Sequence, residues 1–127
     1  MFDPIDRPPA EYRLSRVLSD ELGQSQLSSL RSVIIAAVEN LQRYDRERYA
    51  HKYQDGPVPR LALLTEAHES VAEAGRMIRS MRAGDDDHAL ERRHGINIAT
   101  VIDELWQASN AIGRWIEHER TRGVTDE

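Results

Sequence analysis

The apolar residues of this chain recur at spacings of three and four, so the hydrophobic pattern predicts helices. The strongest predicted helix begins after residue 25, and its apolar stripe comprises Leu27, Leu30, Ile34, Val38 and Leu41. The residues from Arg43 to Tyr49 are very polar, and we expect the helix to continue through them as a solvated or partner-facing extension. No segment alternates with the period of a strand.

Three further helices follow from the same pattern. The first is expected from about Ala10 to Leu22, where Gly23 provides a stop signal. The third should begin at Pro59, a residue favoured in the first helical turn, and run to about Arg82. The last should span about His88–Arg122, with a point near Gly95 where it could loosen. These helices are joined by short loops, which is typical of a bundle.

The sequence therefore predicts one all-α, four-helix bundle-like domain over residues 11–122. An irregular proline-containing arm should precede it at residues 1–10, and a polar tail should follow at 123–127. A chain of 127 residues has room for one core, and such small domains keep a high ratio of surface to volume. Pairing with another copy is a common remedy, so we expect a homo-oligomer.

Composition excludes several classes of protein. The net charge of −5 provides no overall basic face, which disfavours binding to nucleic acid. The chain has no cysteine, so disulfides, thiol catalysis and cysteine metal sites are excluded. No apolar run follows Met1, and the longest apolar stretch, 33–38, is too short to span a bilayer. We expect a cytoplasmic protein of a bacterium or of a phage-infected cell, with no membrane association.

Acidic residues form bands on two of the predicted helices. Glu66, Glu69 and Glu73 share one narrow band of the third helix, where like charges repel each other. Water and salt, an arginine or a divalent cation could offset that repulsion, and carboxylates are ligands that Mg²⁺ prefers. On the last helix Glu104 lies at the flank of the apolar stripe, where it can reach a neighbouring helix. Asp103 faces away and could meet the other acids only beneath a second subunit.

The stretch from Leu63 to Ala74 resembles the metal-binding helix of MazG-like, all-α nucleoside triphosphate pyrophosphohydrolases, in particular divergent, phage-type members. Glu66 and Glu69 match the second and third acids of that motif, and Thr65 stands in the place of the first. The resemblance covers about residues 30–120. The polar segment from Tyr44 to Asp55 is also similar to the run that precedes the motif in phage-type members.

The family's second motif, a glutamate followed three residues later by an aspartate, fits in two registers. In one, Glu104 is the glutamate and Gln107 takes the place of the aspartate. In the other, Thr100 replaces the glutamate, Asp103 is kept, and Asn110 falls where the family often has asparagine. We prefer the first register because of the flank position of Glu104.

The resemblance implies a Mg²⁺-dependent enzyme, with Mn²⁺ as a substitute, that cleaves a nucleoside triphosphate to a monophosphate and pyrophosphate. The implied catalytic residues are Glu69 and Glu66, and the implied metal ligands are Glu66, Glu69, Glu104, Asp103 and Gln107. The candidate substrate contacts are Glu73, Arg76, Lys52, Asn110 and Trp106, whose indole could stack on a base. Family members are dimers or tetramers.

Each departure from the motifs removes a negative ligand and so puts catalysis in doubt more than the fold. The alternative is a non-catalytic helical interaction or accessory protein that retains the bundle only. His68 lies on the apolar face of its helix, where a packed histidine is the commoner role than a metal ligand.

Overall fold

The computed structural model describes residues 9–22, 27–50 and 60–125, and all structural statements below refer to those parts of the chain. Within them every regular element is a helix. The elements are α1 (Pro9–Arg16), the π-helical turn η2 (Val17–Glu21), α2 (Ser28–Ala50), α3 (Arg60–Gly84), α4 (Asp87–His94) and α5 (Ile98–Thr125). The predicted all-α fold is confirmed.

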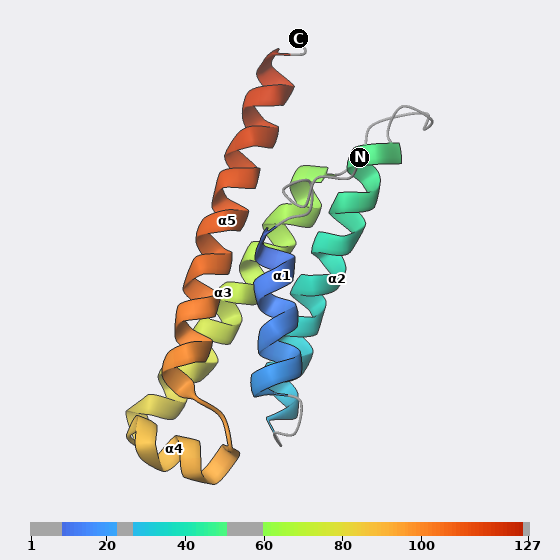
Figure 1. Ribbon diagram of the computed structural model, residues 1–127. Helices are drawn as coiled ribbons and strands as arrows, with labels where there is room; N and C mark the ends of the chain where they lie inside the picture. The colour runs from blue at the N-terminus through green and yellow to red at the C-terminus, as the bar shows by residue number, and fades with distance from the viewer. Residues whose placement is uncertain (1–8, 23–26, 51–59, 126–127) are drawn as a thin grey trace.

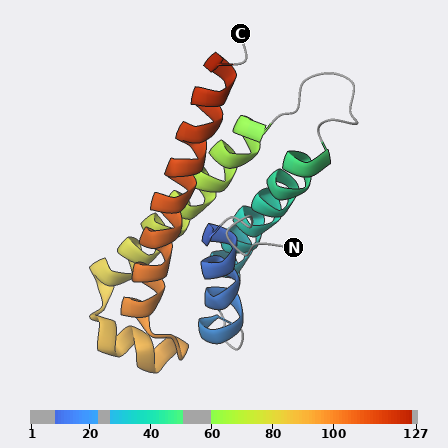
Figure 2. The same cartoon turned by 45° about the horizontal axis from the view of Figure 1, so that its top comes forward.

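Four helices form the bundle, and the fifth joins two of them at one end. α2 and α3 run antiparallel side by side, as do α3 and α5, and α1 lies along α5 and α2 (Figures 1 and 2). The short helix α4 crosses the lower end of Figure 1 between the end of α3 and the start of α5. In this arrangement α5 packs against both α3 and α1.

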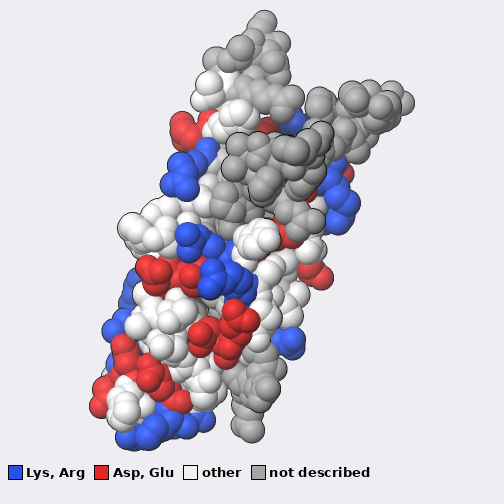
Figure 3. All heavy atoms as spheres, in the orientation of Figure 1, with Lys and Arg blue, Asp and Glu red and all other residues white. Residues whose placement is uncertain are grey.

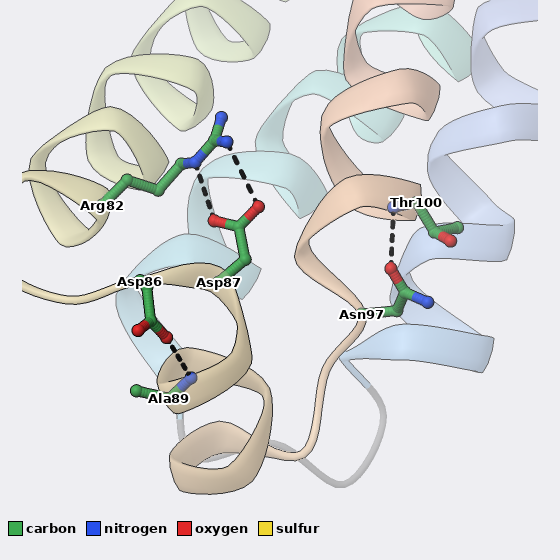
Figure 4. Close-up of polar contacts among 6 residues, drawn as sticks. All are labelled: Arg82, Asp86, Asp87, Ala89, Asn97 and Thr100. Carbon is green, nitrogen blue, oxygen red and sulfur yellow. Dashed lines mark hydrogen bonds and ion pairs between the residues drawn. The ribbon is translucent and has the colours of Figure 1, made fainter.

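The last predicted helix is divided into α4 and α5 at Gly95. This residue has a left-handed backbone, with φ of 70°, and its N–H donates to the Glu91 carbonyl over 2.8 Å. Glycine adopts this conformation without steric cost, which ends α4. Asn97 then begins α5, because its side-chain oxygen accepts a 3.0 Å bond from the Thr100 N–H (Figure 4).

The helix ends differ slightly from those predicted. α1 begins at Pro9, so its first two residues lie in the predicted arm, and α5 continues to Thr125, within the predicted tail. α3 matches its prediction closely. The predicted stop at Gly23, the break before Pro59 and the candidate residue Lys52 lie outside the described residues.

The core lies where the helix stripes meet. Leu14 of α1, Ile34 of α2, Leu64 of α3 and Ile112 of α5 are all fully buried in one cluster. Tyr44 is fully buried as well. The polar stretch after Arg43 is therefore helical, as predicted, but it is not solvated throughout.

None of the helices in the described parts of the chain is long and apolar enough to cross a membrane.

Candidate functional site

The acidic band of α3 lies on an exposed side of the helix. Glu66, Glu69 and Glu73 are all exposed, and 73% of the Glu69 side chain is accessible. At about 100° per residue, this band is rotated by roughly 130° from the side of α3 that faces α5. His68 marks that other side, since its ring Nε2 lies 3.2 Å from the Ser109 hydroxyl of α5. The acids of α3 therefore point away from α5.

Glu104 of α5 faces a different neighbour from the one expected. Its side chain is 13% exposed, and its carboxylate lies 2.9 Å from the guanidinium of Arg13 in α1. Asp103 is exposed, and Gln107 is half-buried. The Arg13 ion pair holds Glu104 on the α1 side of α5, so within one chain this carboxylate does not meet the acids of α3.

The two helices with the acidic motifs thus pack together, but their acids do not converge. Among the described residues, no three histidine, cysteine, aspartate or glutamate side chains are grouped so that they could hold a metal ion. Neither register of the second motif brings an acid opposite Glu66 and Glu69. The Thr65 hydroxyl donates to the Leu61 carbonyl of its own helix over 2.8 Å. A Mg²⁺ site built from these residues stays a prediction that would require more than one chain.

A groove between α3 and α5 brings together two of the predicted substrate contacts. Arg76 and Trp106 both border this groove, whose volume is about 450 Å³. Its lining comprises Val71, Ala72, Gly75, Arg76, Ile78, Arg79 and Arg82 from α3, and Ile102, Leu105, Trp106 and Ser109 from α5. The floor is apolar, and Trp106 remains 62% exposed at the edge. Asn110 is exposed one turn further along α5.

The arginines of the groove differ in their partners. The Arg76 guanidinium lies 2.7 Å from Glu73 and 3.9 Å from Glu69. The hydrogen bond to Glu73 and the attraction of its charge raise the pKa of Arg76 above its ordinary value. Arg82 makes a bidentate pair with Asp87 at 2.8 and 3.1 Å (Figure 4). Only Arg79 has no carboxylate within ion-pair distance among the described residues.

This pairing keeps the charge of the groove low. Acidic and basic side chains are also interspersed on the face of the molecule shown in Figure 3, with uncharged surface between them. A surface without a strong field of one sign gives little attraction to a polyphosphate. The groove therefore combines an apolar floor with three arginines, of which Arg76 and Arg82 are paired with carboxylates outside the lining.

The contact between His68 and Ser109 lacks the further groups that a serine nucleophile requires. A serine nucleophile needs a base held by a third group and donors for an oxyanion. No carboxylate contacts His68 in the described chain, and Ser109 lies within α5, where backbone N–H groups are used by the helix. The pair ties α3 to α5, consistent with the packed role predicted for His68.

A buried polar cluster that the sequence pattern did not predict lies at the end of the bundle opposite α4. The Tyr44 hydroxyl donates to Glu119 over 2.9 Å, and Arg60 lies 3.2 Å from the same carboxylate. Trp115 packs edge-on against Tyr44. A signal existed, because Tyr44 follows Leu41 by three residues and so continues the apolar stripe of α2. The cluster joins α2, α3 and α5.

Comparison of the chain with protein-family models, with curated proteins and with solved structures finds no match.

Proposed function

We propose that this protein is a non-catalytic helical interaction protein that works through the outer face of α3 and α5. The observation that carries the proposal is Trp106, which is 62% exposed beside a groove with an apolar floor. A large exposed aromatic residue next to buried apolar surface is typical of a docking site, because tryptophan dominates the energy of many protein interfaces.

The positions of the acids support this proposal over an enzyme that is complete in one chain. Metal-assisted hydrolysis needs carboxylates that converge on the ion and leave a place for the attacking water. Here Glu104 is held by Arg13 on the α1 side, whereas Glu69 points outward from α3. In this arrangement the acids of α3 act as a charged surface, partly neutralised by Arg76.

The test is a pair of magnesium assays on the purified full chain. We expect no release of pyrophosphate from a panel of nucleoside triphosphates and no change in melting temperature when Mg²⁺ is added. Glu69→Gln should behave like the wild type in both assays. The matched control is Glu117→Gln, which alters an exposed acid on a different helix, α5. Pyrophosphate release that Glu69→Gln abolishes and Glu117→Gln preserves would overturn the proposal.

A second candidate function is the nucleotide pyrophosphohydrolase implied by the resemblance, with its site completed by another chain. The observation that favours it is the incomplete neutralisation of the acidic band. Among the described residues Arg76 is the one cationic side chain within ion-pair distance of the band, and it reaches Glu69 and Glu73 but not Glu66. Under this alternative Mg²⁺ raises the melting temperature, and the effect increases with protein concentration.

A further inference from the structure

The groove between α3 and α5 has complementary features on its two walls. Trp106 projects from the α5 wall, whereas the α3 wall carries the small residues Ala72 and Gly75. A Cβ atom built on Gly75 would meet no atom within 4 Å, so the space above this part of α3 is open. One wall therefore offers a bulky apolar group, and the other offers a place to receive one.

We propose that the occupant of this groove is a second copy of the same chain. The inference rests on the proposed function, since it names the partner of the same face. A two-fold axis along the groove would set α3 of each copy against α5 of the other, which is the self-complementary arrangement of symmetric dimers. Trp106 of each copy then covers the surface around Gly75 of the other.

One charge on the α3 wall and one beside the α5 wall agree with this arrangement. Arg79 of α3 and Asp103 of α5 are both exposed, and neither has an ion-pair partner among the described residues. Asp103 precedes Trp106 by three residues, about one helical turn, so the two side chains lie on neighbouring parts of α5. When α3 of one copy lies against α5 of the other, Asp103 approaches Arg79 of the second copy.

A phosphate-rich ligand fits the same groove less well. The guanidinium groups of Arg76 and Arg82 already contact Glu73 and Asp87, whose carboxylates would repel a polyphosphate. The chain also has a net charge of −5, and the groove floor is apolar. Burial against another protein surface releases water from that floor without bringing in additional negative charge.

The experiment is sedimentation equilibrium of the full chain between about 1 and 100 µM, a range that brackets weak and moderate dimers. We expect a concentration-dependent dimer whose dissociation constant rises at least tenfold in Trp106→Ala, as for other interface tryptophans. Tyr12→Ala alters a similarly exposed aromatic residue on α1 and should leave the constant unchanged. Circular dichroism confirms that each variant retains its helix content.

Charge reversal provides a test that does not depend on truncation. Arg79→Asp and Asp103→Arg should each weaken the dimer, and the double variant should recover most of the lost affinity. A protein that stays monomeric at 100 µM, or a dimer that Trp106→Ala does not weaken, would overturn the inference. If the protein forms no dimer and also releases no pyrophosphate, this inference fails but the proposed function stands. Turnover by a dimer that depends on Trp106 refutes the proposed function and upholds this interface.

Discussion

The buried Tyr44 hydroxyl provides the most direct test of the polar cluster. Tyr44→Phe removes one oxygen and leaves the ring, so it creates almost no cavity. The hydroxyl donates to the carboxylate of Glu119, whose side chain is 6% exposed and is also paired with Arg60. A hydrogen bond to a charged group contributes about 1.5–3 kcal/mol to stability. The bond from Tyr44 to Glu119 is buried, so we assign it a value within that range. We expect Tyr44→Phe to lower the free energy of unfolding by about 2 kcal/mol.

Urea denaturation followed by circular dichroism measures this loss as a lower midpoint with an unchanged slope. Tyr12→Phe is the matched control, because Tyr12 is 61% exposed. Its effect should stay within about 0.5 kcal/mol. If Tyr44→Phe falls within the same limit, the reasoning is refuted, and Arg60 alone satisfies the buried carboxylate.

Three further changes test the helix ends and the core by the same denaturation assay. Asp86→Ala removes the side-chain oxygen that accepts the Ala89 N–H over 2.7 Å at the start of α4, and it should cost about 1 kcal/mol; an unchanged midpoint would contradict that capping role. Gly95→Ala should cost about 1–2 kcal/mol, because φ is 70° there although the space is open; a neutral result would argue against the left-handed backbone. Leu64→Ala should cost about 2–5 kcal/mol, whereas Leu61→Ala, at an exposed position of the same helix, should cost far less; equal losses would contradict the burial of Leu64.

Helix positions could be predicted well because their signals are local. Pro59 and the apolar stripe gave α3 boundaries within two residues of the observed Arg60–Gly84. Gly95 was expected only to loosen a long helix, but it ends one. Whether a glycine bends or terminates a helix depends on the following residues, and here Asn97 supplies a new cap for α5.

The neighbours of each helix face could not be predicted in the same way. Helical periodicity shows which residues share a face, but it does not say which helix covers that face. Glu104 was correctly placed on a flank of α5, yet the helix it meets is α1 rather than α3. Tyr44 was interpreted from its polar sequence neighbours, whereas its environment is set by Glu119, 75 residues away. Both errors concern contacts between distant parts of the chain.

The packing of α1 against α5 has a consequence for synthesis of the protein. Arg13 contacts Glu104 across 91 residues, and Glu21 accepts the Asn97 N–H across 76. α1 therefore cannot complete these contacts until the first two turns of α5 have been translated. Leu14 of α1 and Val17 of η2, which are buried in the finished fold, stay uncovered by α5 on the nascent chain until then. Surfaces of this kind are the ones that chaperones bind and that aggregate when translation stalls.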